Sequence, residues 1–148
     1  MSKTYPPSAE IENTVQINEA KYDSMYQGSI NQPEIFWAVQ AKRLHWYKVP
    51  TKIKNTSFEG DVSIKWYEDG MLNACYNCVD RHLDAYKNKA ALIFVPESEA
   101  KPAHTLPYQE LYVRVNEVAA VLRDFCGLHA GDRVTIHMPM IPELPTTM

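Results

Sequence analysis

Apolar side chains recur at intervals of three and four residues in the first third of the chain, a spacing that predicts two consecutive helices. The first follows Asn18, a residue suited to cap it, and ends in a turn at residues 31–33. The second begins near Pro33, where the missing N–H of proline costs nothing. Their apolar faces consist of Tyr22, Met25, Tyr26 and Ile30, and of Ile35, Phe36, Val39 and Trp46. This pattern predicts a helical hairpin, preceded by a mobile lead-in at residues 1–17 that has no lasting period.

The pattern changes from strand-like to helix-like at Gly70. Residues 47–62 are polar and interrupted by proline and glycine, so they are predicted to be irregular. Residues 63–67 have the β-branched and aromatic content of a short strand, and residues 68–70 are predicted to form a turn. Asn73 is then predicted to open one helix with a buried face. That face consists of Cys75, Cys78, Val79, His82, Leu83 and Tyr86.

The last third of the chain predicts a strand, a long helix and a second strand. Residues 90–95 form a continuous apolar run, which favours a strand covered on both faces. After a loop at residues 96–107, residues 108–126 keep the helical period, and Gly127 can cap their end. A turn at Gly131-Asp132 leads into a second short strand at residues 133–138. The fold class is therefore predicted to be α/β, with the helical hairpin and short strand leading into a βαβ unit.

That βαβ unit is expected to be incomplete. It would bury its strands by recruiting further strands and covering helices, but only residues 139–147 precede Met148. Pro145 stands where a covering helix would have to run. We therefore expect the front end of a larger α/β protein or a truncated gene product, marginally stable and prone to self-association through exposed strand edges. The expected parts are the lead-in at residues 1–17, an N-terminal region at 18–86 and the start of a domain at 87–148.

Composition narrows the class of protein. Hydrophobic residues make up 45% of the chain and charged residues 22%, which provides enough apolar material for a core. The net charge of −3 gives no basic footprint for nucleic acid or an anionic membrane, and no apolar run approaches the ~20 residues of a membrane span. Three cysteines, an odd number, argue against a secreted disulfide framework. A cytoplasmic location is the expectation, with neither nucleic acid nor membrane as a partner.

Cys75 and Cys78 form a C-x-x-C motif for which three interpretations compete. A redox dithiol would sit at a helix N-terminus directly after a strand, but here a Gly-Met-Leu-Asn turn intervenes. Half of a zinc site is possible in geometry, since Cys78 and His82 are spaced i, i+4, yet the remaining cysteine, Cys126, falls on another predicted helix. Packing of both thiols in the core is the favoured interpretation.

Other titratable residues predict structural roles. Asp80, Arg81 and His82 point about 100° apart on a helix, so their side chains do not converge on one reacting atom. The other histidines, His45, His104, His129 and His137, fall on separate segments. None of the five glycines belongs to a phosphate-binding loop, and no G-x-S-x-G or H-E-x-x-H motif occurs. The chain therefore contains no complete active site.

Several short motifs together resemble one enzyme family. Lys65-Trp66-Tyr67, Asp69-Gly70-Met71-Leu72-Asn73 and the stretch from Asn77 to His82 resemble the signature of acetyl-coenzyme A synthetases and related acyl-CoA synthetases. Upstream, residues 22–26 and Phe36-Trp37 resemble the N-terminal region of that family. Downstream, residues 108–111, 131–134 and 138–143 resemble the start of the AMP-binding domain of adenylate-forming enzymes.

The resemblance implies a ligase reaction in two steps. Acetate and ATP give acetyl-adenylate and pyrophosphate, and CoA then attacks to give acetyl-CoA and AMP. The intact family uses ATP, Mg and CoA, but the resemblance places the phosphate loop, the acetate pocket, the CoA-binding arginines and the catalytic lysine beyond residue 148. No catalytic, cofactor-binding or metal-binding residue is therefore assigned here, and this chain is expected to bind no cofactor.

Three positions depart from the family pattern. Pro107 stands where a Ser or Thr usually caps the long helix and pairs with Glu110, a loss that typically costs ~0.5–2 kcal/mol and that Thr105 would offset only in part. His137 replaces a common Tyr, and residues 144–147 replace an Ala- and Val-rich helix start.

Three hypotheses about function follow. The leading one is an N-terminal fragment of an acetyl-CoA synthetase, inactive alone. The second is a non-enzymatic interaction module that complements a separately encoded remainder of the synthetase. The third, a small metal or redox protein using Cys75 and Cys78, is disfavoured by the number of available ligands.

Overall fold

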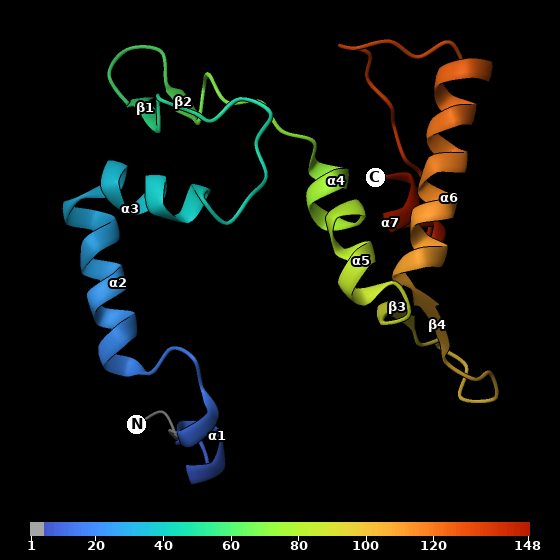
Figure 1. Cartoon of the computed structure of the whole chain (residues 1–148), viewed down its shortest axis with the longest axis horizontal. Helices are drawn as coiled ribbons and strands as arrows, with labels where there is room; N and C mark the ends of the chain where they lie inside the picture. Colours follow the sequence, from blue (N-terminus) through green and yellow to red (C-terminus); the bar gives the residue numbers. More distant parts are fainter. Residues whose placement is uncertain (1–4) are drawn as a thin grey trace. The chain divides into compact units, whose positions relative to one another are not determined.

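The computed structural model describes residues 5–148 (Figure 1). Contacts divide the chain into two units, the first ending at Leu72 and the second running from Asn73 to Met148. Both units mix helices with strands, so the predicted α/β class is confirmed. None of the described helices combines the length and the apolar character that a membrane crossing requires.

The first unit contains three helices and a hairpin within its described residues. Its elements are α1 (Ala9–Thr14), α2 (Glu19–Asn31), α3 (Pro33–Ala41), β1 (Lys54–Ser57) and β2 (Ser63–Trp66). The second unit, as far as it is described, begins with a broken helix and continues with a hairpin and a long helix. Its elements are α4 (Ala74–Cys78), the 3₁₀ turn η1 (Asp80–His82), α5 (Leu83–Tyr86), β3 (Ala90–Phe94), β4 (His104–Pro107), α6 (Tyr108–Ala120), the π turn η2 (Val121–Phe125) and α7 (Glu143–Thr147).

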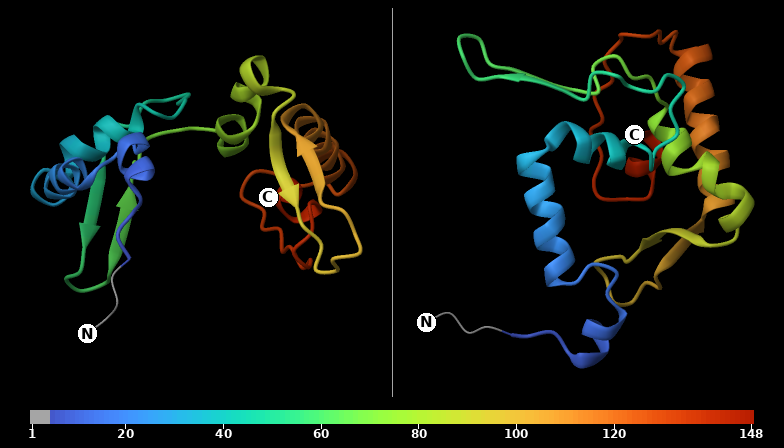
Figure 2. Two further views of the ribbon diagram at one scale, coloured as in Figure 1. Left: turned by 90° about the horizontal axis from the view of Figure 1, so that it is seen from below. Right: turned by 60° about the vertical axis from the view of Figure 1, so that its left-hand side comes forward.

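The two predicted helices form where the capping residues predict them, but α2 and α3 lie at a wide angle on either side of Gln32 rather than folded back as a hairpin (Figure 1 and Figure 2). The Asn18 side chain accepts a hydrogen bond from the Lys21 N–H at 3.0 Å, and Pro33 is the first residue of α3. The lead-in differs from the expectation, because residues 9–14 form α1 behind a Ser8 cap. A serine that can accept from the first turn, followed by two glutamates, is a local signal for a short helix.

Aromatic side chains join α3 to the hairpin. The rings of Trp37 and Trp66 pack edge to face with centroids 5.7 Å apart, and those of Trp46 and Tyr67 lie 5.5 Å apart. The Tyr67 hydroxyl donates to the Trp37 carbonyl at 3.0 Å, and the Trp46 indole donates to the Ala41 carbonyl at 2.8 Å. The polar tips are satisfied by backbone while the rings pack, which is how large aromatics stabilise a small unit.

Residues 47–62 are less irregular than predicted. Residues 54–57 form β1 and pair antiparallel with β2, with Lys54 opposite Trp66 and Ser57 opposite Ser63. The polar sequence Lys-Asn-Thr-Ser has little strand propensity of its own. Backbone pairing with β2 stabilises this strand, and so do the hydrogen bonds that the Asp69 carboxylate accepts from residues 51 and 52. These interactions compensate for the low strand propensity of the local sequence.

The Asp69 side chain forms hydrogen bonds with residues 51 and 52, just before β1. Its carboxylate accepts hydrogen bonds from the Lys52 N–H and the Thr51 N–H, both at 2.9 Å, and from the Thr51 hydroxyl at 2.7 Å. The backbone N–H of Lys52, followed by the Thr51 hydroxyl, holds the pKa of the Asp69 carboxyl well below its ordinary value of 3.8.

Replacement of Asp69 by asparagine is expected to lower the thermal midpoint of the chain at pH 7. Folding favours the carboxylate, so its contribution is complete above the unfolded-state pKa and is lost as the pH falls through the folded-state value. The difference in midpoint between the native chain and D69N should therefore shrink as the pH is lowered from about 6 toward about 2. Thermal melts followed by circular dichroism measure it, and a difference that stays constant over that range would contradict the role assigned to the carboxylate.

The central helix is interrupted. Asn73 caps α4 as predicted, with its side chain accepting from the Tyr76 N–H at 2.9 Å, but Val79 has φ −123° and ψ −68° and ends the helix. A 3₁₀ turn and α5 follow, so residues 75–86 do not present one common buried face. Val79 is buried, whereas Cys78 and Tyr86 are exposed. Helical periodicity predicts the burial of Val79, but it predicts neither the break in the helix nor the exposure of Cys78 and Tyr86.

The core of the second unit lies between the β3–β4 hairpin and α6. Leu106 on β4 is 1% exposed and packs with Val79 and Leu111. Both views in Figure 2 show β3 and β4 side by side, paired antiparallel with Leu92 opposite Leu106 and Phe94 opposite His104. The loop predicted at residues 96–107 is therefore wrong at its end, where β4 forms.

The predicted βαβ arrangement differs from the observed topology. Residues 133–138 have no strand partner among the described residues, and β3 pairs instead with β4. The nine-residue connection between β3 and β4 closes at a lower entropic cost than a crossover through α6. Ile93 is 67% exposed, so β3 is covered on one face rather than two.

Backbone hydrogen bonds take the place of a side-chain cap at the start of α6. Pro107 makes no capping hydrogen bond, but the Tyr108 N–H donates to the Lys89 carbonyl at 3.1 Å and the Gln109 N–H to the Lys87 carbonyl at 2.9 Å. After α6, the Thr146 hydroxyl donates to the Pro142 carbonyl at 2.8 Å within α7. The expectation that the prolines exclude a helix here is wrong, since proline is tolerated in a first turn that needs no N–H donor.

Candidate functional site

Part of the stretch with the densest chemistry, within residues 73–80, lines a cleft in the second unit. The cleft has a volume of about 640 Å³ and lies between α4, α6 and α7. Cys75, Val79, Leu111 and Val115 form much of its apolar wall, and Thr146 closes one side. The apolar face predicted for the long helix supplies Leu111, Val115, Val118 and Leu122. The sequence did not predict the wall formed by α7, because Pro142 and Pro145 argue against a helix at these positions.

Cys75 is half-buried at this cleft. Its Sγ lies 3.7 Å from an Asp80 carboxylate oxygen, the thiol acting as the donor. Burial, and then the negative charge of Asp80, raise the pKa of the Cys75 thiol above its ordinary value. Reactive cysteines have lowered pKa values in electropositive surroundings, so Cys75 is the opposite of an activated nucleophile.

Cys75 is expected to be alkylated more slowly than Cys78 and Cys126 at pH 7.5 or thereabouts. Both latter thiols are exposed, whereas Cys75 is half-buried and favours the unreactive protonated form. Time-resolved labelling with iodoacetamide, read out by peptide mass spectrometry, orders the three rates. Asp80→Asn should accelerate labelling of Cys75 and leave Cys126 unchanged as the internal control. Equal rates at Cys75 in both chains would contradict the influence of Asp80.

The Asp80-Arg81-His82 run does not converge on one point, as helix geometry predicts. Asp80 turns toward Cys75, the Arg81 guanidinium donates to the Asn77 side-chain oxygen at 2.8 Å, and His82 Nε2 lies 3.1 Å from the Asn77 carbonyl. The His82 ring also packs against Tyr108, with centroids 5.8 Å apart. These contacts tie η1 to α4 and α6, which is a structural role.

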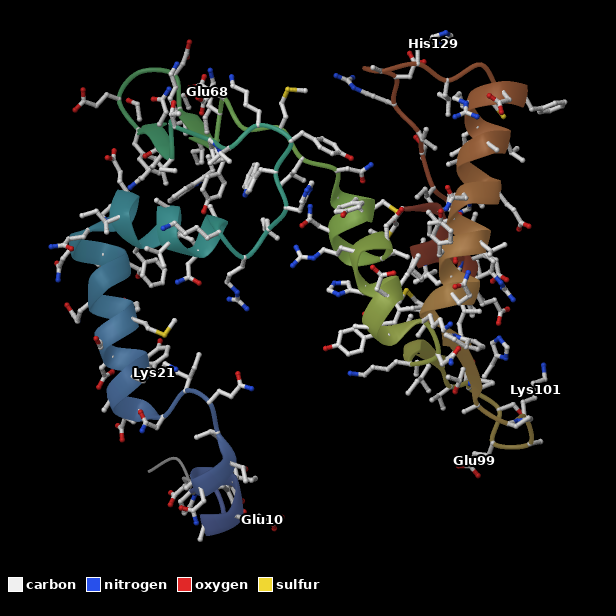
Figure 3. All side chains as sticks on the ribbon, viewed as in Figure 1. Glu10, Lys21, Glu68, Glu99, Lys101 and His129 are labelled. Carbon is white, nitrogen blue, oxygen red and sulfur yellow. The ribbon has the colours of Figure 1, made fainter. Side chains whose placement is uncertain are left out.

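Residues of metal-binding type are not brought together. Within residues 5–148, no three His, Cys, Asp or Glu side chains form a group that could hold a metal ion. In the second unit His104 begins β4, and His129 lies on the loop that follows α6 (Figure 3). The described side chains therefore do not provide the cluster of carboxylate ligands that a divalent cation such as Mg²⁺ prefers.

The cleft itself is shaped for packing. Polar side chains in its lining have partners within the protein: the hydroxyls of Thr146 and Thr147 donate to the Pro142 and Glu143 carbonyls, and Asn116 donates to the Tyr112 carbonyl at 2.8 Å. The Asn73 side chain accepts from the Tyr76 N–H, and the Asp80 carboxylate accepts from the Cys75 thiol. A ligand site would present polar groups aimed into the cavity. An apolar hollow with satisfied polar groups fits an apolar side chain better than a nucleotide.

Comparison with known proteins gives two family matches and a consistent set of relatives. The model of the acetyl-coenzyme A synthetase N-terminus matches residues 22–78, and the model of the AMP-binding enzyme matches residues 79–148. The acetyl-coenzyme A synthetase of Bartonella quintana (strain Toulouse) is 48% identical over 148 residues, covering 99% of this chain. Those of Xylella fastidiosa (strain Temecula1) and Rhizobium meliloti (strain 1021) are each 46% identical over 97% and 99% of it.

The matched part is the same in each relative. The chain spans 22% of the length of each of these three synthetases. The two family models meet at residues 78 and 79, next to the point where α4 ends and Val79 enters the core. From these matches and the signature residues around Gly70 and Asn77, the chain belongs to the acetyl-coenzyme A synthetase family, of which it carries the N-terminal region and the start of the AMP-binding domain.

Proposed function

We propose that this chain serves as the N-terminal part of an acetyl-CoA synthetase and is catalytically inactive by itself. The observation that carries the proposal is the match of nearly the whole chain to 22% of each relative's length. In the family, the reaction converts acetate, ATP and CoA into acetyl-CoA, AMP and pyrophosphate. The motifs for phosphate binding are not among the residues present here, and the described side chains assemble no donor set for Mg.

Exposed apolar side chains support a role that depends on further protein. Ile93 is 67% exposed, Val95 71% and Phe125 88%, and all three follow or belong to elements of the second unit. Further protein packed against the second unit would remove these apolar side chains from water. The unpaired cysteines among the described residues fit a reducing compartment, so we place the protein in the cytoplasm.

Acetate-dependent exchange between ATP and pyrophosphate tests inactivity directly. The purified 148-residue chain is expected to show no exchange above a protein-free blank, because nucleotide phosphates have no cradle in it. The full-length synthetase of Bartonella quintana, assayed in parallel, serves as the positive control. Acetate-dependent exchange by the chain alone would overturn the proposal.

The exposed apolar surface also favours a second candidate, a module that complements a separately encoded remainder. Here the test is to mix the chain with the Bartonella quintana synthetase from which the matching N-terminal residues have been deleted. Restored exchange on mixing, absent from either component alone, would support complementation. Failure to restore it, with both components folded by circular dichroism, would favour the first candidate.

A further inference from the structure

The helix α1 is folded, although its apolar side chain Ile11 is exposed. It is six residues long and contains no buried residue. Isolated helices this short are marginal in water, because nucleation is unfavourable and few hydrogen bonds follow. An apolar ridge runs beside it, since Ile11 is 53% exposed, Val15 43% and Ile17 49%. The surface that would stabilise this segment must therefore be apolar.

The same segment is acidic. Glu10 and Glu12 lie in α1, and no Lys or Arg occurs between residues 4 and 20. No ion pair involving Glu10 or Glu12 is present among the described residues, and Figure 3 shows Glu10 pointing away from the helix. Residues 8–17, named here the acidic segment, thus combine exposed carboxylates with exposed apolar side chains.

The complementary surface lies elsewhere in the same unit. A groove of about 390 Å³ is lined by Ala41, Leu44, Val49 and Ile53, with Trp46 as one wall and Lys42 at its margin. Residues 42–58 contain five Lys or Arg and no Asp or Glu. We name this surface the basic groove. Its apolar lining and cationic margin match the two properties of the acidic segment.

The cations at the groove are available. Among the described residues, no carboxylate lies within ion-pair distance of the Lys42, Lys48 or Lys52 ammonium groups. The nearby carboxylate of Asp69 is occupied by the Lys52 backbone N–H and by Thr51. All three lysine side chains are exposed. Lys42 lines the groove itself, whereas Lys52 lies outside its lining and interacts electrostatically with the Glu68 carboxylate.

Chain connectivity decides which copy supplies the segment. Residues 15–18 join α1 to α2, and four extended residues span at most about 14 Å. The thirteen residues of α2 separate this joint from α3 by about 20 Å, and the groove begins at the far end of α3. Folded back, the acidic segment would lie along α2 rather than in its own groove. A second copy has no such restriction.

We propose that the acidic segment of one copy docks in the basic groove of a second copy, and that the exchange is reciprocal. Two short helices contribute a small interface, so the dimer belongs to the weak class and depends on salt. Each contact buries the Ile11 ridge against the groove lining and places Glu10 and Glu12 near Lys42 and Lys52. This inference is independent of the synthetase reaction.

Sedimentation velocity of the full chain tests the dimer. We expect concentration-dependent dimerisation whose dissociation constant rises about tenfold between low salt and about 0.5 M salt. K42E/K52E and E10K/E12K should each weaken self-association by about tenfold or more, since each places like charges opposite one another. The matched controls are K87E/K101E and E97K/E99K, which make the same charge changes at exposed positions of the second unit (Figure 3).

Mixing the two variants is the decisive measurement. In a dimer of one E10K/E12K chain and one K42E/K52E chain, both contacts regain opposite charges. An equimolar mixture should therefore associate about tenfold more tightly than either variant alone, which is not expected for the mixed controls. A native chain that stays monomeric at low salt up to about 0.2 mM would overturn the proposal. So would association that survives both variants and is lost in Ile93→Lys, because that assigns it to the edge of β3.

Discussion

Replacement of Leu106 by alanine is expected to lower the free energy of unfolding of the second unit by about 2–5 kcal/mol. Leu106 is the most buried large side chain among the described residues, at 1% exposed, and packs with Val79 and Leu111. Truncation removes its transfer free energy and leaves a cavity that β4, held by α6 and β3, has little freedom to fill. Native domains have only about 5–15 kcal/mol of stability in total, so this loss is a large fraction of it.

Urea denaturation of the full chain, followed by far-ultraviolet circular dichroism, measures this change. Ile93→Ala is the matched control, because Ile93 lies on the neighbouring strand but is 67% exposed, and it should change stability by less than about 0.5 kcal/mol. If Leu106→Ala and Ile93→Ala have equal effects, the core does not lie where the structure places it.

Replacement of Gly70 by alanine is expected to destabilise the first unit by about 1–3 kcal/mol. A Cβ at this position would lie 2.7 Å from Trp46 Cζ3 and 3.1 Å from Pro50 Cβ. The Trp46 ring is fixed by its hydrogen bond to the Ala41 carbonyl and by the Tyr67 ring, so it has no simple route to retreat. The close approach of backbone to ring therefore requires glycine.

The destabilisation caused by Gly70→Ala is measured by the thermal midpoint, and the displacement of the tryptophan rings by near-ultraviolet circular dichroism. Gly28→Ala provides the control, since its Cβ would meet Phe36 at an ordinary 3.7 Å and glycine inside α2 is a poor helix former. That variant should be neutral or more stable by up to about 1 kcal/mol. If the Gly70→Ala chain were as stable as the Gly28→Ala chain, the Trp46 ring would be able to move aside for the added methyl group, which would contradict the prediction.

Gly70 and Asp69 also explain why the signature residues around them suggested a functional site. Gly70 is constrained by a tryptophan, and Asp69 next to it holds two backbone N–H groups. Val79 contributes to the core of the second unit, and Asp80 bonds Cys75. Specific residue types at fixed spacing therefore arise here from packing and hydrogen bonding.

Local signals predicted much of the molecule. Asn18 and Asn73 cap helices, Pro33 begins α3, residues 63–66 and 90–94 form strands, and Gly127 follows the long helix with φ +68°. Asp80, Arg81 and His82 make separate contacts as predicted, although they lie in a 3₁₀ turn rather than on the predicted α-helix. Each of these depends on residues within a few positions of one another, so the sequence contains the whole physical cause.

The sequence by itself determined the helix caps, the positions of β2, β3 and α6, and the family of the chain, because these rest on local propensity and on residue identity. The tertiary structure alone decided that β3 pairs with β4, that residues 54–57 join β2, and that the central helix breaks at Val79 and leaves Cys78 and Tyr86 exposed. Strand pairing and helix interruption depend on contacts between residues that are far apart in the sequence. The local sequence is compatible with more than one strand partner and more than one helix length. The close contact of Gly70 with Trp46 belongs to the same class, because only the folded chain brings the two together.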